Sequence, residues 1–222
     1  MKRWLVIVAL AACSDGGREL PMHVVVTAHS VTAWLDAADI LPCNCHPFVF
    51  PAAGSCSTST DAGPCSGNPY CPSCVTDFAV EENGVRLTPT ADGGNDPWTR
   101  YYNPFSDGTH ALVIAGCGHP TTRISLDGAA FPTATAAAQQ GSDDTQVSWT
   151  TDATTQQALV TRSGGYGDET CFVDGAAQYT FAGAVGLGVE VQPLGAAHDE
   201  ETALGHVTIW RAGDASASLP MP

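Results

Sequence analysis

Residues 146–162 read QVSWTTDATTQQALVTR, and this stretch decides the fold. Polar and apolar side chains alternate from Gln146 to Thr150, and the segment from Ala158 to Arg162 is short, apolar and β-branched. A period of two residues is typical of a strand with one buried face, whereas a helix repeats every 3.6 residues. The threonines and the aspartate between the two segments are typical of a turn. The stretch therefore predicts two β-strands joined by a turn.

The same pattern continues on both sides of this unit, interrupted by Gly, Pro, Asn and Asp. Further strands are predicted at His23–Thr27, Phe78–Leu87, Ala111–Ala115, Arg123–Leu126, Gln178–Phe181, Gly188–Gln192 and His206–Arg211. One segment allows two interpretations. Val31, Trp34, Leu35 and Ala38 have helical spacing, but Val31, Ala33 and Leu35 also alternate as in a strand. The chain is predicted to be all-β with at most this one short helix.

Two of these segments predict more than their own conformation. Asn83-Gly84 supplies the two positive φ angles of a type I′ turn, so Phe78–Leu87 is predicted to be a hairpin. Its register would place Glu81 opposite Arg86, with apolar residues on the other face. Ala111–Ala115 is apolar at every position, which predicts a central strand buried on both faces.

The central stretch also carries a family resemblance. VSWTTDATTQQALVTR resembles strands B and C of fibronectin type III domains, and GVEVQPL (188–194) and HVTIW (206–210) would then be strands F and G. The tyrosine usual in strand C of that family is replaced by Ala158 or Leu159. The resemblance implies two immunoglobulin-like or fibronectin III-like β-sandwiches. They would span residues 22–118, with a cysteine-rich loop at 43–74, and residues 119–213, followed by a frayed tail at 214–222.

The N-terminus indicates the cellular compartment. Lys2 and Arg3 precede an uncharged apolar run, Trp4–Ala12, which is typical of a signal peptide and too short to span a bilayer. Leu10-Ala11-Ala12-Cys13 resembles the lipobox of bacterial lipoproteins. That resemblance implies cleavage of residues 1–12, acylation of Cys13 and a lipidated linker at 13–21. Ser14, rather than Asp, follows the cysteine, which implies attachment to the outer membrane of the cell envelope.

The charge balance excludes one class of partner and assigns the anchoring to lipid. The 222 residues carry a net charge of −15, and a nucleic-acid-binding protein would need a basic face. Cleavage would remove Lys2 and Arg3, leaving six basic against the 23 acidic residues, a net charge of −17. Such a body is repelled by an anionic bilayer. The lipid on Cys13 is thus the predicted membrane contact, and a protein or a glycan is the predicted ligand.

Eight cysteines remain after the lipidated one. An even number in an exported chain predicts disulfides, with 105 possible pairings. The predicted set is Cys43, Cys45, Cys56, Cys65, Cys71, Cys74, Cys117 and Cys171. If the six cysteines between residues 43 and 74 pair among themselves, Cys117 and Cys171 remain as partners.

Two alternatives compete for the cysteine-rich loop. Cys43-Asn44-Cys45, His46 and the pair Cys71 and Cys74 could supply soft ligands for Zn²⁺ or Cu(I). The C-x-x-C spacing could instead form a redox centre, although that motif usually needs a thioredoxin-like context. The metal alternative predicts a metal-binding envelope lipoprotein in place of a disulfide-stapled one.

Other candidate sites are weaker. Trp98, Arg100, Tyr101, Tyr102 and Phe105 crowd one predicted loop, where aromatic faces and polar groups could bind a sugar or a peptide. The acidic runs Asp92–Asp96 and His198–Glu201 lack EF-hand spacing and are predicted to be solvated turns. No catalytic triad, carboxylate pair, metal site or cofactor motif can be singled out, so an unrecognised hydrolase is the remaining alternative. The leading prediction is a non-enzymatic, lipid-anchored, disulfide-stapled envelope protein with a structural or binding role.

Overall fold

A computed structural model describes most of the chain after the N-terminal segment. The described residues are 22–35, 50–58, 79–82, 85–86, 88–89, 98–101, 110–116, 119–126, 130–164, 167–183, 188–203 and 205–219. They form 18 β-strands and no helix. The prediction of an all-β fold is therefore confirmed. No helix in the described ranges is long and apolar enough to cross a membrane.

The strands belong to four sheets. The six-stranded sheet contains, in spatial order, β16 (His198–Thr202), β17 (Gly205–Arg211), β1 (Met22–Val26), β2 (Ser30–Leu35), β7 (Trp98–Tyr101) and β6 (Thr88–Pro89). The five-stranded sheet contains β18 (Ala215–Ala217), β15 (Gly188–Pro193), β12 (Gln157–Gly164), β13 (Gly167–Asp174) and β3 (Cys56–Thr58). The four-stranded sheet contains β5 (Val85–Arg86), β4 (Ala79–Glu82), β8 (His110–Gly116) and β9 (His119–Leu126). The three-stranded sheet contains β10 (Ala134–Gln140), β11 (Asp144–Thr151) and β14 (Gln178–Ala182).

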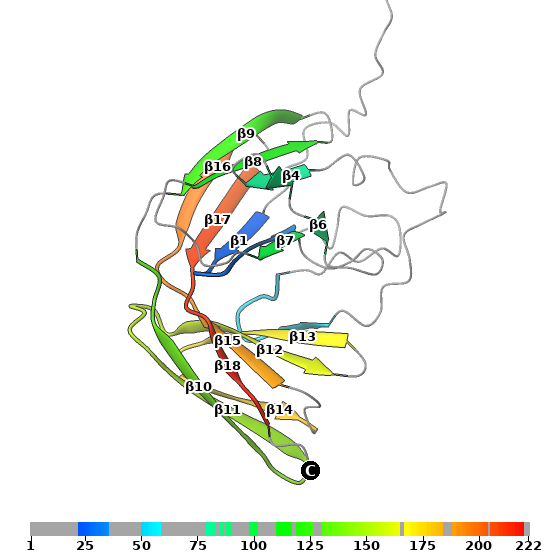
Figure 1. Ribbon diagram of the computed structural model, residues 1–222, viewed down its shortest axis with the longest axis vertical. Coiled ribbons are helices and arrows are strands. Elements are labelled where there is room, and N and C mark those ends of the chain that lie inside the picture. Colours follow the sequence, from blue (N-terminus) through cyan, green and yellow to red (C-terminus); the bar gives the residue numbers. More distant parts are fainter. Residues whose placement is uncertain are drawn as a thin grey trace, which may run out of the picture.

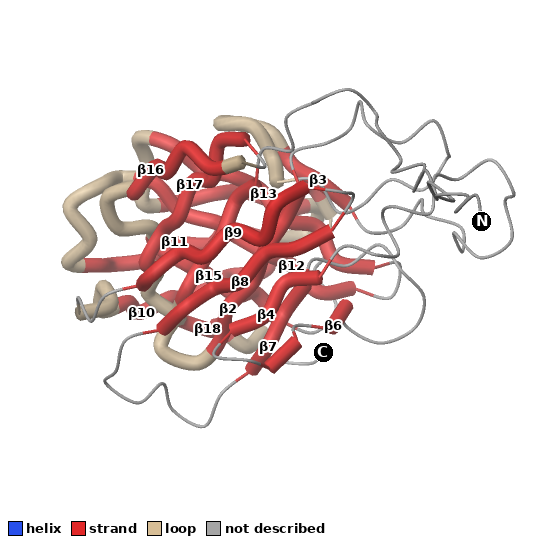
Figure 2. Tube along the Cα trace, turned by 90° about the horizontal axis from the view of Figure 1, so that it is seen from above, coloured by secondary structure: helices blue, strands red, loops and turns tan. Residues whose placement is uncertain are grey.

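The sheets are stacked as layers. Figure 1 shows the four-stranded sheet at the top, the six-stranded sheet below it, then the five-stranded sheet and the three-stranded sheet. Seen from above in Figure 2, β9, β8 and β4 lie over the strands of the six-stranded sheet. Strand β1 is accordingly buried on both faces, since Val24, Val25 and Val26 are at most 1% exposed. A strand covered on both faces reads as a continuous apolar run, as HVVV does.

The two lower sheets face one another across an apolar core. Val147 and Trp149 from β11 and Phe181 from β14 pack against Val160 and Val191 of the five-stranded sheet. In β11 the buried residues alternate with the exposed Gln146, Ser148 and Thr150. The alternation that predicted this strand therefore reflects one face in the core and one in solvent.

A second core joins the five-stranded sheet to the six-stranded sheet. Leu159 and Phe172 point away from the first core and pack with Val25 and Trp210. Phe50 lies between the layers, and its ring centroid is 4.9 Å from that of Trp210 in a stacked arrangement. The five-stranded sheet is thus buried on both faces, and its two cores hold the upper and lower parts of the molecule together.

The predicted domain boundary at residue 118 does not separate the sheets. Strand β1 pairs in parallel with β17, so the two ends of the chain share the six-stranded sheet. Strand β3 pairs with β13 in the five-stranded sheet. The predicted division into sandwiches at 22–118 and 119–213 is therefore wrong. Hydrophobic patterning identifies strands but not which distant strands pair, because backbone pairing is not residue-specific.

The predicted tail is also wrong for residues 215–219. Strand β18 pairs antiparallel with β15, Val191 lying opposite Ala215. Ala217 is 7% exposed and Leu219 is 9% exposed. Leu219 belongs to the core between the two lower sheets, so this segment completes the five-stranded sheet.

The remaining strand predictions have mixed outcomes. Residues 31–35 form a strand, so the helical interpretation is wrong there. The hairpin register is confirmed, with Glu81 opposite Arg86. Strand β8 lies between β4 and β9 as predicted. Its burial on both faces is not found, however, because Val113 is only half-buried while Leu112 and Ile114 are buried. This sheet is the outermost layer in Figure 1, which explains its partly open face.

Candidate functional site

Several predicted site residues lie outside the described part of the chain. These are the lipid-attachment residue Cys13, the cysteines Cys43, Cys45, Cys65, Cys71, Cys74 and Cys117, His46, and the acidic run Asp92–Asp96. The disulfide and metal hypotheses for the cysteine-rich loop consequently remain predictions, except at Cys56.

The structure forms one disulfide from the predicted set. Cys56 and Cys171 are bonded, and their Cα atoms are 3.9 Å apart. The expected partnership of Cys171 with Cys117 is therefore wrong. The cysteine-rich loop is tied to β13 through Cys56 instead of pairing only within itself.

Local pairing explains why these two cysteines meet. Cys56 in β3 lies directly opposite Cys171 in the antiparallel strand β13. The amide of the next residue, Phe172, donates a hydrogen bond to the carbonyl of Ser55, and Phe172 accepts one from Gly54. The cysteines therefore occupy a non-hydrogen-bonded pair, in which opposite side chains are closest. Gly54 has a φ of 75°, a left-handed conformation that glycine adopts without a Cβ clash.

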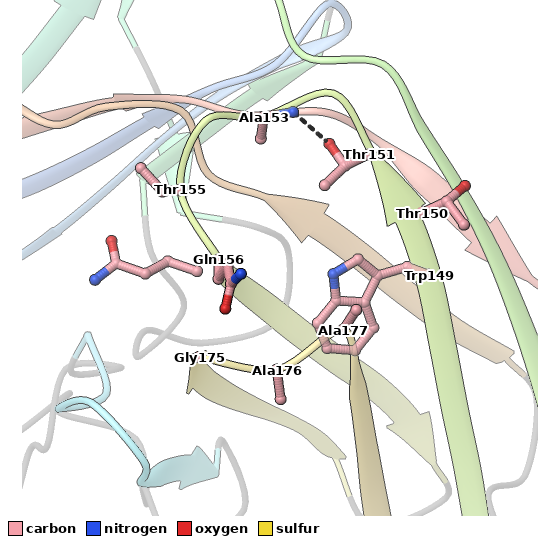
Figure 3. A pocket seen from close by; sticks show the side chains of 10 residues that line it. Trp149, Thr150, Thr151, Ala153, Thr155, Gln156, Gly175, Ala176 and Ala177 are labelled. Carbon is pink, nitrogen blue, oxygen red and sulfur yellow. Dashed lines mark hydrogen bonds between the residues drawn. The ribbon is translucent and has the colours of Figure 1, made fainter.

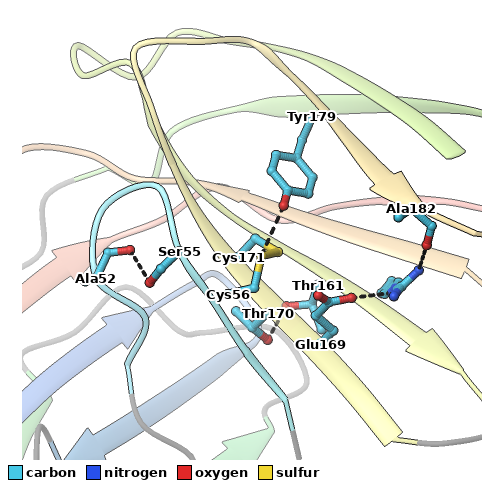
Figure 4. The surroundings of a disulfide bond; sticks show 10 residues. Ala52, Ser55, Cys56, Thr161, Glu169, Thr170, Cys171, Tyr179 and Ala182 are labelled. Carbon is cyan, nitrogen blue, oxygen red and sulfur yellow. Dashed lines mark hydrogen bonds and ion pairs between the residues drawn. A yellow bond between two sulfur atoms is a disulfide. The ribbon is translucent and has the colours of Figure 1, made fainter. Parts of the chain in front are cut away.

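Three polar side chains surround the disulfide on the inner side of the sheet (Figure 4). Tyr179 Oη lies 3.1 Å from Cys56 Sγ, and the phenol is the donor because a disulfide sulfur carries no hydrogen. The Glu169 carboxylate lies within 4.8 Å of both sulfur atoms. Arg162 Nε lies 2.5 Å from Glu169 Oε2. The Arg162 guanidinium also donates to the Ala182 carbonyl at 2.8 Å, which links the two sheets of the sandwich.

The electrostatics keep the tyrosine protonated. Burial raises the pKa of Tyr179 above its ordinary value, and the Glu169 carboxylate raises it further, against the opposing effect of Arg162. Ionisation would place a second negative charge beside Glu169 without adequate hydration. Tyr179 therefore stays a hydrogen-bond donor to the disulfide at neutral pH.

The surroundings of the bond disfavour thiol exchange. Cys171 is 1% exposed, so an incoming thiolate can reach only the exposed Cys56 sulfur. That attack would expel a Cys171 thiolate into a buried position near the Glu169 carboxylate. Burial and a neighbouring negative charge both raise a thiol pKa, and a thiol of higher pKa is a poorer leaving group. The arrangement is that of a structural staple rather than a redox centre.

Cys56, Glu169 and Cys171 also form a group that could hold a metal ion, because their ligand atoms lie within 4.8 Å of one another. Two thiolates and a carboxylate suit Zn²⁺. The ligands would have to be the reduced thiolates, and in the structure the two sulfur atoms are bonded to each other. The oxidised state described here therefore does not supply this ligand set.

The predicted aromatic ligand loop is a strand over part of its length. Trp98 to Tyr101 form β7, which pairs with β2 and places Trp98 opposite Ala33 and Tyr101 opposite Ser30. Tyr102 and Phe105 lie outside the described residues. A loop that presents all five predicted residues to a ligand is therefore wrong for residues 98–101.

The acidic run at 198–201 is also a strand instead of a turn. It forms β16, an edge strand whose carboxylates contact a histidine of β17. His206 Nδ1 lies 3.0 Å from Glu201 Oε1, and His206 Nε2 lies 3.2 Å from Asp199 Oδ1. Hydrogen bonding to Glu201 raises the pKa of His206 above its ordinary value, with a further contribution from Asp199.

A pocket that the sequence did not indicate lies at one end of the lower sandwich (Figure 3). It has a volume of about 430 Å³, within the range of small-molecule sites. Three segments form it: the end of β11, the connection from β11 to β12, and the turn between β13 and β14. The lining residues are Trp149, Thr150, Thr151, Ala153, Thr155, Gln156, Gln157, Gly175, Ala176 and Ala177.

Comparison with known proteins adds no assignment to this geometry. No family model matches the chain, and the searches of curated proteins and of solved structures gave no significant match.

Proposed function

We propose that this chain is a lipid-anchored, disulfide-stapled protein of the bacterial cell envelope whose β-sheet body has a structural role or binds a ligand or a protein. The proposal combines the lipobox-like Leu10-Ala11-Ala12-Cys13 with one structural observation, the Cys56–Cys171 disulfide. Disulfides persist in oxidising compartments such as the bacterial periplasm and cell surface. The staple therefore supports export, which the signal-like N-terminus predicts independently.

The proposal includes a fibronectin type III-like organisation of the lower sandwich. Strands β11 and β12, the predicted strands B and C, lie in facing sheets, and β15 pairs with β12 as strand F would. The segment predicted as strand G, 206–210, lies in the six-stranded sheet, and β18 occupies the position beside β15. The hairpin β16–β17 would then be an insertion between strands F and G.

Anchoring is tested by processing and fractionation of the full-length chain in a Gram-negative host. We expect the wild type to partition with membranes and to gain acyl mass at Cys13. Cys13→Ser should leave the membrane fraction or retain its signal segment, because no thiol is available for acylation. Ser14→Ala is the matched control and should be processed normally. A Cys13→Ser protein with wild-type mass shift and membrane partitioning would refute the anchoring proposal.

A further inference from the structure

We propose that the pocket at the end of the lower sandwich binds a short neutral saccharide. The inference deepens the ligand-binding part of the proposed function and names its ligand class. It does not depend on the lipid anchor. It rests on the chemistry of the pocket lining, which combines an indole, free amides and small apolar side chains without a charge.

Trp149 supplies a buried donor to the pocket. Its side chain is only 6% exposed, and its backbone amide donates to the carbonyl of Ala177 at 3.1 Å, which holds it against the neighbouring turn. Figure 3 shows the indole nitrogen on the side of the ring that faces Gln156. Among the described residues, no acceptor is hydrogen-bonded to this nitrogen. A buried indole N–H usually finds a partner, and a ligand hydroxyl at this place would accept its hydrogen bond.

Gln156 and Gln157 supply both donors and acceptors. Each amide offers a carbonyl oxygen and an NH₂ group. Neither side-chain amide is hydrogen-bonded within the part of the chain that the structure describes. A sugar hydroxyl donates one hydrogen bond and accepts others, so it pairs well with primary amides. An apolar ligand would leave both amides unsatisfied, at a cost in affinity.

The threonines fix the shape of the pocket. The Thr151 hydroxyl donates to the Thr133 carbonyl at 2.8 Å and accepts from the Ala153 amide at 3.0 Å. The Thr155 hydroxyl donates to the carbonyl of Leu194. These bonds hold the connection between β11 and β12 in one conformation. A preformed site lowers the ordering cost of binding, which matters for a small ligand.

The lining selects a neutral ligand. None of the ten lining residues is charged, in a chain whose net charge is −15. Asp152, within the same connection, accepts a hydrogen bond from the Thr133 amide at 2.7 Å. An anion would be repelled by the acidic body, and a cation would find no carboxylate in the lining. The methyl groups of Ala153, Ala176 and Ala177 offer apolar contacts to the C–H face of a sugar ring.

Calorimetric titration of the purified full-length chain tests the proposal. The chain is held in a detergent without a sugar headgroup and titrated with chitotriose and with maltotriose. We expect at least one trisaccharide to bind with a dissociation constant of about 1 mM or lower. Trp149→Phe keeps the aromatic packing but removes the N–H, and it should weaken binding about fivefold. Gln139→Leu, at an exposed position of β10, is the matched control and should bind like the wild type.

Three results would overturn the proposal: no binding of either trisaccharide up to about 10 mM, unchanged binding by Trp149→Phe, or tighter binding of trigalacturonate than of the neutral sugars. Near- and far-ultraviolet circular dichroism of Trp149→Phe separates a lost contact from a lost fold. If that variant misfolds, Gln156→Leu, at an exposed position, replaces it with the same expected loss. The Cys13→Ser chain is titrated in parallel. Failure of anchoring with intact sugar binding affects only the proposed function, and the converse affects only the pocket.

Discussion

Removal of the Cys56–Cys171 disulfide should destabilise the molecule strongly. The bond joins residues 115 positions apart in the sequence. On the chain-entropy model, closing a loop of this length in the unfolded chain contributes about 5 kcal/mol to the free energy of unfolding. The native cost falls at the edge of the five-stranded sheet, where β3 has three residues and pairs only with β13 among the described strands. We therefore expect a loss of about 5 kcal/mol, with separation of β3 as the first local event.

The double variant Cys56→Ser, Cys171→Ala is the appropriate perturbation. Alanine is chosen at position 171 because that side chain is 1% exposed and a serine hydroxyl would be buried. Urea unfolding followed by tryptophan fluorescence gives the free energy of unfolding and its slope against urea. Ser57→Ala, in the same strand, leaves the bond intact and should change stability by no more than about 0.5 kcal/mol.

Two results would refute this reasoning. The first is a loss below about 1 kcal/mol in the double variant, which would mean that the bond does not restrain the unfolded chain. The second is a peptide map of the unreduced wild type in which Cys171 is linked to another cysteine. The map also separates the structural premise from the energetic one, because it reports the pairing irrespective of stability.

Two further predictions concern the upper hairpin and the close approach between sheets. Hydrogen bonding to Glu201 raises the pKa of His206 above 6.5, so Glu201→Gln should lower it in an NMR titration; the pairing stabilises the fold at low pH and fades as pH rises through the raised pKa, and identical pKa values in both proteins would contradict this. A Cβ at Gly213 would lie 2.8 Å from the Pro132 carbonyl oxygen, whereas one at Gly188 would meet only a carbonyl at 3.6 Å. Gly213→Ala should therefore lower the free energy of unfolding by about 1–3 kcal/mol while Gly188→Ala changes it little, and equal thermal denaturation of the two would contradict the packing argument.

The strands that sequence patterning predicted share a physical property. In β11 the buried Val147 and Trp149 alternate with exposed polar residues, so burial follows the period of the strand. Strand β1 was visible for a different reason, since its apolar run is covered on both faces. In both cases the local sequence carries the burial pattern directly, and no knowledge of distant partners is needed.

The strands that patterning missed lack that local signal. In β13 the consecutive residues Cys171, Phe172 and Val173 are all buried, because one face meets each core, but polar residues dominate the first half of the strand. Strand β16 consists largely of charged residues and is held by backbone pairing with β17. Acidic residues are typical of turns as well as of edge strands, so composition alone favoured the turn.

The candidate sites depended on pairings that local sequence does not encode. Eight cysteines allow 105 connectivities, and the choice of Cys56 for Cys171 follows from the register between β3 and β13. The pocket depends on the approach of two connections that are separate in sequence. The turn at Gly175 is brought to the β11–β12 connection by a hydrogen bond from its amide to the Gln156 carbonyl at 3.0 Å. Sequence reasoning identified Trp149 as a strand residue but not the space beside it.

The topology gives the proposed anchor and the disulfide independent attachments to the body. If Cys13 is acylated, the eight residues Ser14–Pro21 reach at most about 27 Å before the chain enters β1. That strand pairs with β17 on one side and β2 on the other, and its valines are buried on both faces. Force from the membrane would therefore act on a central strand of the molecule and not on a fraying end. Reduction of the Cys56–Cys171 bond would loosen β3 but leave β1 paired, so the body should stay tethered while its stability falls.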